Sequence, residues 1–313
     1  MKAAQIKEYG DASIVTVNEI ERPVPWQGQV LVEVHAASLN PFDSTVRSGY
    51  VKDSIPLDLP ITLGGDIAGL IVAVGDGVDT VSVGDAVYGQ AAAVAGNSGA
   101  FAEYATTSAN QIAKAPSNLD MEEAASLPLV GVSALQALTE HINLQSGQQI
   151  FIHGGAGGIG SVAIQIAKNI GAHIATTATG DDFERVKKLG ADEVINYKRE
   201  DFSELLRDYD AVFDTVGHDD FLKSFTILKK GGVAVSMIAL PDEAKAQELG
   251  ITAMVQSTKV TTKRLDKLRG LVEQGVVTPR IGKVFSLDQI REAFTARESG
   301  TVSGKIVLEI KNN

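Results

Sequence analysis

A glycine-rich stretch near the middle of the chain has residue types and a spacing that could bind phosphate. Residues 153–160 read HGGAGGIG, and from Gly155 they match the pattern G-x-G-x-x-G. In this pattern the first glycine permits a tight turn, the second lets the backbone approach a pyrophosphate, and the third lets a helix pack close to a strand. The candidate diphosphate-binding residues are Gly155, Ala156, Gly157, Gly158, Ile159 and Gly160.

Such a loop binds an anion only when a strand leads into it and a helix follows it. Residues 149–153 (QIFIH) have the apolar composition of a buried strand, and residues 161–170 place their apolar side chains on one side of a helix. The free N–H groups and the partial positive charge at the start of the helix would then face the anion. A flexible glycine turn without a ligand is the alternative interpretation.

The alternation of strand and helix continues through the middle of the chain. Further strands are expected at 173–177, 193–196, 210–214 and 232–238, and helices at 121–138 with a break at Pro128, 182–189 and 221–229. Strands that alternate with helices of about ten residues are typical of a parallel sheet covered by helices. We therefore predict an α/β dinucleotide-binding domain of the doubly wound (Rossmann) kind.

The first third of the chain has a different pattern, in which short strands follow one another. Residues 30–36 alternate apolar and polar side chains, and residues 67–74 and 83–89 combine strand-forming residues with glycine turns. This spacing predicts a small, partly closed β unit, with a generic β-sandwich as the alternative.

The C-terminal part is expected to return to this first unit. It contains two candidate helices, 262–274 and 287–298, and a last strand at 305–310. Because chain termini often lie close together, that strand could join the β unit. We expect residues 1–121 and 259–313 to form one domain, and residues 122–258 to form the dinucleotide-binding domain.

The end of the second strand of the α/β domain bears on the choice between NAD and NADP. Enzymes that use NAD usually place an acidic residue there to bind the ribose hydroxyls. This chain has Thr177 instead, which does not repel a 2′-phosphate and so favours NADP(H). Asp181 and Asp182 follow, with no Lys or Arg beside them, and Lys198 or Arg199 could supply the positive charge.

Composition excludes several classes of partner and chemistry. The 313 residues include 28 Lys plus Arg and 39 Asp plus Glu, a net charge of −11 that disfavours nucleic acid and anionic membranes as partners. The absence of cysteine excludes a disulfide, a thiolate nucleophile and a Cys-ligated zinc site. The start lacks the apolar core of a secretory signal, and no apolar run nears the ~20 residues of a membrane span. We expect a soluble, cytoplasmic protein.

Several motifs, taken in their order along the chain, are similar to those of one protein family. They are residues 38–43 (SLNPFD), 64–69 (GGDIAG), 155–168 (GAGGIGSVAIQIAK) and 304–308 (GKIVL). The chain resembles the zinc-independent branch of the medium-chain dehydrogenase/reductase superfamily, in particular the quinone oxidoreductases and the alkenal/enone reductases. The resemblance implies a GroES-like β-barrel catalytic domain, a Rossmann domain that binds NADP(H), and an active site in the cleft between them.

The resemblance also bears on metal binding. Alcohol dehydrogenases of this superfamily hold a catalytic zinc with two cysteines and a histidine, but this chain has Asn40 at the first cysteine's place. Its five histidines are scattered, without the HExxH or paired helical spacing of a metal site. We expect no bound metal. Hydride would then go to an acceptor that is already electrophilic, a quinone or the β-carbon of an α,β-unsaturated carbonyl.

Roles for individual residues follow from the same resemblance. The candidate catalytic residues are Asn40, near the nicotinamide and the substrate, and Tyr50, a donor to the substrate oxygen. The resemblance implies further cofactor contacts by Ser133, by Thr177, Thr179 and Tyr197 at the adenosine ribose phosphate, by Val216 at the adenine, and by Ile238 and Ala239 at the nicotinamide ribose. A turn asparagine, a tyrosine that only packs and a helix-surface serine are the alternatives for Asn40, Tyr50 and Ser133.

Residues 251–257 fall where members of the family pair sheet edges across a homodimer, and an interior strand is the alternative there. We therefore expect a homodimeric, NADPH-dependent, zinc-free reductase of quinones or enones. An enoyl-thioester reductase and a protein that binds NADPH with little turnover are the alternative functions.

Overall fold

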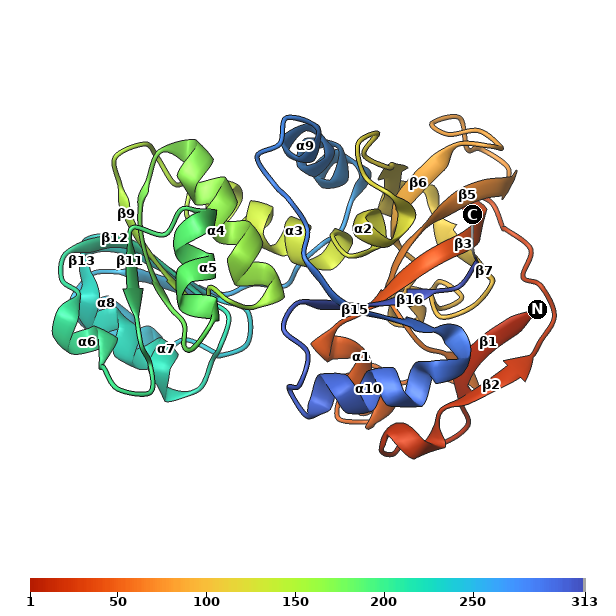
Figure 1. The fold of residues 1–313 in the computed structure, drawn as a ribbon, viewed down its shortest axis with the longest axis horizontal. Coiled ribbons are helices and arrows are strands. Elements are labelled where there is room, and N and C mark those ends of the chain that lie inside the picture. Colours follow the sequence, from red (N-terminus) through yellow and green to blue (C-terminus); the bar gives the residue numbers. More distant parts are fainter. Residues whose placement is uncertain (312–313) are drawn as a thin grey trace. The chain divides into compact units, whose positions relative to one another are not determined.

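The computed structural model describes residues 1–311, which form two compact units (Figure 1). The first unit combines Met1–Leu129 with Val260–Glu273 and the residues from Pro279 onward, and the second combines Val130–Lys259 with Gln274–Thr278. The first unit therefore runs past residue 121, the predicted boundary. It does so because helix α2 (Met121–Ala125) packs against strands of the first unit.

The second unit is built on a sheet of parallel strands in the order β11-β10-β9-β12-β13-β14. The strands are β9 (Gln149–His153), β10 (His173–Thr177), β11 (Glu193–Ile195), β12 (Tyr209–Asp214), β13 (Leu228–Ser236) and β14 (Thr252–Val255). This order is that of a doubly wound nucleotide-binding fold, so the predicted fold class is confirmed. The order reverses at β9 and β12, and ligands of such sheets bind beyond the carboxyl ends of the strands at that point.

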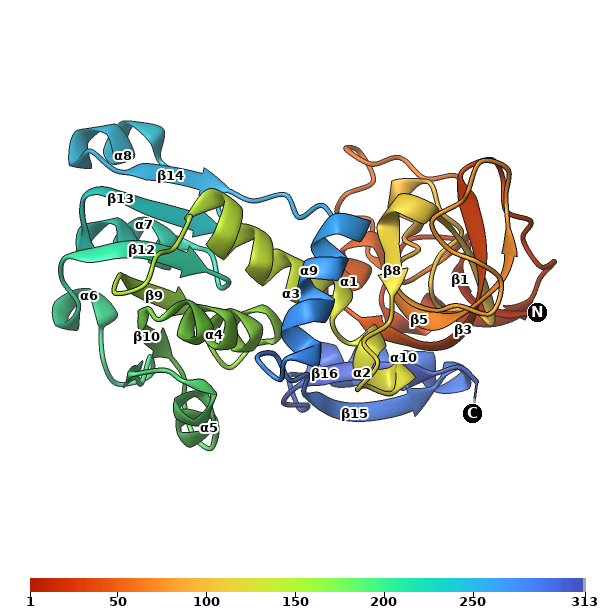
Figure 2. The same cartoon turned by 90° about the horizontal axis from the view of Figure 1, so that it is seen from above.

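Helices cover both faces of this sheet. They are α3 (Pro128–Gln136), α4 (Gly158–Ile170), α5 (Asp182–Leu189), α6 (Phe202–Leu205), α7 (Asp219–Lys223) and α8 (Glu243–Leu249). Figure 2 shows α4 and α7 on opposite sides of the strands. Because side chains alternate along a strand, Phe151 of β9 packs with Phe202 of α6 and Phe221 of α7, while its neighbours point to the other face.

One predicted helix is broken where the sequence predicted, and another differs from the prediction. The helix expected at 121–138 with a break at Pro128 is divided there into α2 and α3. The prediction of a helix at 221–229 was wrong at its C-terminal end, because α7 stops at Lys223 and β13 begins at Leu228. Leu228 pairs with Tyr209 of β12, so sheet pairing replaces the last helical turn.

The first unit is mainly antiparallel, apart from the parallel pair β15 and β16. Its strands are β1 (Lys2–Ile6), β2 (Thr16–Glu19), β3 (Gln29–Leu39), β4 (Ile61–Thr62), β5 (Asp66–Val74), β6 (Ala86–Gln90), β7 (Tyr104–Ser108), β8 (Ile112–Lys114), β15 (Ile281–Ser286) and β16 (Lys305–Glu309). One sheet has the order β15-β16-β3-β5-β6-β8 with β7 also on β3, and a smaller one has the order β2-β1-β4. As predicted, the last strand returns to this unit, where β16 pairs with β3.

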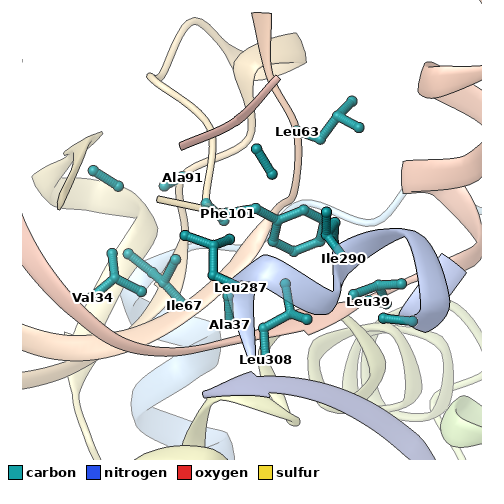
Figure 3. Packing of buried hydrophobic residues seen from close by; sticks show 14 of the residues in the cluster. Val34, Ala37, Leu39, Leu63, Ile67, Ala91, Phe101, Leu287, Ile290 and Leu308 are labelled. Atoms are coloured by element: carbon teal, nitrogen blue, oxygen red, sulfur yellow. The ribbon is translucent and has the colours of Figure 1, made fainter. Parts of the chain in front are cut away.

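Besides α2, the helices α1 (Pro41–Arg47), α9 (Thr262–Glu273) and α10 (Ile290–Glu298) accompany these strands. The core contains buried residues of the strands together with residues of α1 and α10. Figure 3 shows Leu39 at the end of β3, Ile67 at the start of β5 and Phe101 in this core. The burial of Leu39 and Ile67 fixes the polar residues next to them, Asn40 and Asp66. Within residues 1–311, no helix is long and apolar enough to cross a membrane.

Candidate functional site

The glycine loop connects the end of β9 to the start of α4. The N-cap of α4 is Gly157, which has no side chain to cap the first N–H groups of the helix. The N–H groups of Gly158, Ile159 and Gly160 in the first turn therefore have no side-chain acceptor. An anion placed there would be bound by these N–H groups and stabilised by the positive end of the helix dipole.

The three glycines of the motif are required for different reasons. A Cβ on Gly155 would lie 2.1 Å from Oγ1 of Thr176, and a Cβ on Gly160 would lie 2.2 Å from the carbonyl oxygen of Gly154. Packing within the protein therefore excludes a side chain at both positions. A Cβ on Gly157 would meet only the Gly154 carbonyl, at 3.3 Å. Gly157 is exposed, so its missing side chain leaves room on the outer side of the loop.

Three neighbouring strands end in polar residues beside this loop. His153 of β9, Asp214 of β12 and Ser236 of β13 are aligned in the sheet register. Asp214 is fully buried, and its carboxylate accepts a hydrogen bond from Oγ of Ser236 at 2.6 Å and lies 3.2 Å from Nδ1 of His153. We call these three residues, with the N–H groups that they bind, the Asp214 network.

The Asp214 network holds the two loops that follow β12 and β13. The Asp214 carboxylate accepts hydrogen bonds from the N–H groups of Val216 and Gly217, at 3.1 Å each. Oγ of Ser236 accepts hydrogen bonds from the N–H groups of Ile238 at 3.1 Å and Ala239 at 2.9 Å. One buried carboxylate therefore fixes the backbone at Val216, Ile238 and Ala239, the positions predicted to contact the cofactor.

Electrostatics keep Asp214 ionised. Burial alone would raise the pKa of its carboxyl group, but the hydrogen bonds from His153, Ser236 and the N–H groups of Gly217 and Val216 outweigh burial and lower that pKa.

The residues expected at the adenosine ribose lie in different environments. Thr177 is 2% exposed, and its Oγ1 accepts a hydrogen bond from the N–H group of Gly154 at 2.9 Å. Thr179 is half-buried, whereas Tyr197 is exposed. Ser133 is buried in α3, where its hydroxyl lies 2.8 Å from that of Thr258.

The first unit contains a second buried polar group, around Asn40. Nδ2 of Asn40 donates to the Asp66 carboxylate at 2.9 Å, and Oδ1 of Asn40 accepts from Nζ of Lys305 at 2.7 Å. These two contacts fix the orientation of the amide, because only its nitrogen can donate and only its oxygen can accept. Asp66 also accepts from Nε2 of Gln90 at 3.0 Å and from the N–H group of Leu129 at 3.2 Å.

A second carboxylate, that of Asp43, lies beside Asn40. It accepts a hydrogen bond from the backbone N–H group of Asn40 at 2.7 Å. Burial raises the pKa of Asp43 to about 7, and burial also raises the pKa of Asp66 despite the nearby ammonium. For the same reason burial lowers the pKa of Lys305. We call Asn40, Asp43, Asp66 and Lys305 the Asn40 cluster.

Tyr50, the other candidate catalytic residue, is not part of this cluster. Its side chain is 86% exposed in the turn after α1. Within the described residues its hydroxyl forms no hydrogen bond.

Sequence reasoning missed most of the buried partners. Asp214 could have been found, because it ends a predicted strand and the carboxyl ends of neighbouring parallel strands meet at one edge of the sheet. Ser236 was harder to find, since the predicted strand ran on to residue 238 whereas β13 ends at Ser236. Lys305 could not, since 265 positions separate it from Asn40 in the sequence.

The side chains of the described residues do not form a metal-binding site. Across residues 1–311, no three His, Asp or Glu side chains are placed to hold a metal ion, and the chain has no cysteine. The residues therefore do not fit a zinc site of the kind that holds the metal with two cysteines and a histidine.

Two family models match the chain. Residues 26–117 match the alcohol dehydrogenase GroES-like domain, and residues 189–308 match a model described as zinc-binding dehydrogenase. The first match covers most of the antiparallel strands of the first unit.

Individual proteins match over almost the whole length. The chain is 35% identical to 2-methylene-furan-3-one reductase of Solanum lycopersicum, over 98% of this chain and 79% of that protein. It is 33% identical to the chloroplastic NADPH-dependent alkenal/one oxidoreductase of Arabidopsis thaliana, with the same coverage of both proteins. Among solved structures, the quinone oxidoreductase of Coxiella burnetii has a TM-score of 0.89 and 33% identity, over 99% of both chains.

Proposed function

Because this chain belongs to the zinc-independent quinone and alkenal reductase branch of the medium-chain dehydrogenase/reductase superfamily, we propose that it reduces quinones or α,β-unsaturated carbonyls with NADPH. One observation carries the proposal: the uncapped glycine loop at the point where the strand order reverses, with Gly157 open on its outer side. This is where a doubly wound sheet binds a dinucleotide.

The residues of the second unit fit the cofactor. The N–H groups of Gly158, Ile159 and Gly160 would hold the diphosphate. The Asp214 network would hold the backbone at Val216, Ile238 and Ala239 against the nucleoside parts. When bound, NADPH supplies a hydride, and the acceptor must be electrophilic by itself because residues 1–311 offer no fitting site for zinc.

Asn40 and Tyr50 are the substrate-side residues that we propose. The amide of Asn40 keeps a second N–H on Nδ2 after donating to Asp66, and an N–H at that position could stabilise negative charge on a substrate oxygen. Tyr50 offers an exposed hydroxyl that could donate to the same kind of oxygen.

The decisive experiment measures NADPH oxidation with 9,10-phenanthrenequinone, a panel of small enones and crotonyl thioesters. We expect acceleration by the quinone or the enones above the rate without acceptor. Faster turnover of the thioesters would favour an enoyl-thioester reductase, and no acceleration by any acceptor would favour a protein that only binds NADPH.

The assignment of the loop is tested by Gly157→Val. A valine side chain there would occupy the outer side of the loop, so we expect NADPH affinity to fall at least 100-fold, about 2.7 kcal/mol. Because a Cβ at this position meets only one protein atom within 4 Å, we expect the urea midpoint of unfolding to change little. Unchanged NADPH affinity, measured by calorimetry, would contradict the assignment.

We also propose a cytoplasmic homodimer that pairs through β14. This strand is at the edge of its sheet rather than in the interior, and an edge strand presents unpaired N–H and C=O groups. Light scattering coupled to gel filtration would give the mass. Val255→Pro, which removes an N–H group on the side of β14 that faces away from β13, should then yield a monomer.

A further inference from the structure

We propose that Arg185 recognises the 2′-phosphate of NADPH and gives this chain its preference for NADPH over NADH. The inference rests on the proposed use of NADPH and adds the residue that supplies the positive charge. From the sequence alone, Lys198 or Arg199 was expected to supply this charge, because Asp181 and Asp182 follow the end of β10 with no cation beside them.

Arg185 lies between the second strand and the glycine loop. It is on α5, the helix that follows β10, and its Nη2 donates to the carbonyl oxygen of Ala156 at 2.8 Å. Ala156 lies between Gly155 and Gly157, the first two glycines of the motif. The guanidinium is thus fixed next to the diphosphate loop, on the side where the second strand ends.

This is the side where the adenosine ribose of a dinucleotide is bound. In doubly wound domains the residue at the end of the second strand contacts the ribose hydroxyls, and an arginine nearby accommodates a 2′-phosphate. In this chain that strand end is Thr177, whose Oγ1 already binds the N–H group of Gly154. Thr177 carries no charge, and because it is only 2% exposed it offers little accessible surface to a phosphate.

The guanidinium has donors left for a ligand. Nε and Nη2 both contact one oxygen of Asp182, at 2.9 Å, which with the Ala156 bond occupies one side of the group. Nη1 makes no hydrogen bond within the described residues. The side chain is 19% exposed, so it is held in place but remains accessible. A planar guanidinium fixed in this way suits a phosphate, which it can bind through two N–H groups.

The positive charges expected from the sequence are less well placed. Lys198 and Arg199 are exposed in the turn after β11, whereas Arg185 is bonded directly to the loop. Asp182 sets the orientation of Arg185 and also partly neutralises it. It follows that removing the Asp182 charge should strengthen phosphate binding and removing the Arg185 charge should weaken it.

A purely structural role would leave a different signature. If Arg185 only holds the glycine loop through Ala156, its loss should weaken the binding of every adenine nucleotide equally. Adenosine 2′,5′-bisphosphate and 5′-AMP separate the two roles, because they differ only in the 2′-phosphate. Neither nucleotide is redox-active, so the measurement does not depend on turnover.

The test is calorimetry with both nucleotides on the full chain and on Arg185→Gln, which keeps an N–H donor but loses the charge. We expect the bisphosphate to bind 10- to 100-fold more weakly to the variant, about 1.4 to 2.7 kcal/mol, with 5′-AMP unchanged within about twofold. The KM for NADPH should rise in parallel while the KM for NADH stays constant. Asp182→Asn should bind the bisphosphate more tightly than the unmodified chain.

Lys187→Gln is the matched control, because it removes the same charge from the same helix at a side chain paired with Glu184. We expect it to keep both affinities. If Arg185→Gln binds both nucleotides more weakly by the same factor, or binds both as the unmodified chain does, Arg185 does not recognise the 2′-phosphate. If the unmodified chain does not distinguish the two nucleotides, the preference for NADPH is itself wrong.

Discussion

Buried aspartates lie in both units, but their surroundings differ. Asp214 is enclosed by N–H and O–H donors, and its pKa is lowered. In the Asn40 cluster, Asp66 also accepts hydrogen bonds from four groups, those of Ser38, Asn40, Gln90 and Leu129, yet its pKa and that of Asp43 are raised. The comparison shows that burial does not by itself decide the charge of a carboxyl group. What decides it is whether the hydrogen bonds to the ionised form outweigh desolvation, and they do so at Asp214 but not at Asp66.

The two arrangements serve different purposes in the proposed enzyme. A carboxylate that stays ionised and fully bonded fixes backbone geometry, as the Asp214 network does for two cofactor loops. In the Asn40 cluster the pKa of Asp43 is raised to about 7, so this group changes its protonation near neutral pH, while Asp66 and Lys305 hold the amide of Asn40. Three substitutions test this difference.

The largest effect is expected for Lys305→Met. Loss of the ammonium removes the buried positive charge that stabilises the Asp43 and Asp66 carboxylates and leaves Oδ1 of Asn40 without its donor. Removing one member of a group of buried charges destabilises a protein by about 3–5 kcal/mol. Urea unfolding at pH 7.5 measures the change in the free energy of unfolding. Adding Asp66→Asn should restore a large part of it, because the two charges interact.

Lys311→Met is the control for this substitution. Lys311 follows the same strand but is exposed in its ion pair with Glu33, so its loss should change the free energy of unfolding by about 0–1 kcal/mol. Equal effects of the two lysine substitutions would contradict the buried-charge interpretation of the Asn40 cluster.

Asp214→Ala should have the next largest effect, about 3 kcal/mol, because it leaves several buried donors without an acceptor. We also expect NADPH affinity to fall, since the loops at Val216 and Ile238 lose their common anchor. Urea unfolding and calorimetry with NADPH measure the two effects. Asp219→Ala, at an exposed carboxylate at the start of α7, should leave both unchanged, and a similar loss there would argue against a specific role for Asp214.

The smallest effect is expected for Asp43→Asn, and it depends on pH. Between pH 3.8, the ordinary pKa, and about 7, the folded chain binds a proton at Asp43 that the unfolded chain has released. Stability should therefore fall as pH rises through this range. Asp214 has the opposite sign: its stabilisation is present above pH 3.8 and is lost as pH falls toward its lowered folded-state pKa.

Asp43→Asn should flatten the slope of stability with pH and stabilise the protein by about 2 kcal/mol at pH 8. Urea unfolding at intervals from pH 4 to pH 8 measures the slope, and the exposed Asp53→Asn is the control. A slope that survives in Asp43→Asn would assign the pH dependence to another group.

Individual residues show how far the sequence reaches. The glycine spacing predicted the outer opening at Gly157 and the close packing at Gly160, and the structure shows both. The first glycine differs: Gly155 is required by packing against Thr176, and the positive φ of the turn falls on Gly154. Thr177 was found by its position after a strand, but spacing cannot show whether a hydroxyl faces a ligand or the loop beside it. Arg185 was missed because its partner, Ala156, belongs to a different strand–helix connection.

The sequence by itself determined the class of fold and the class of cofactor. Both depend on local signals: the periodicity of strands and helices, and glycines that a phosphate-binding turn requires. The tertiary structure decided which side chains hold the site together. Hydrogen bonds act over about 3 Å, whereas the residues they join, such as Asn40 and Lys305, lie far apart along the chain. Which of them meet, and which stay charged, depends on the packing of strands that local patterns do not specify.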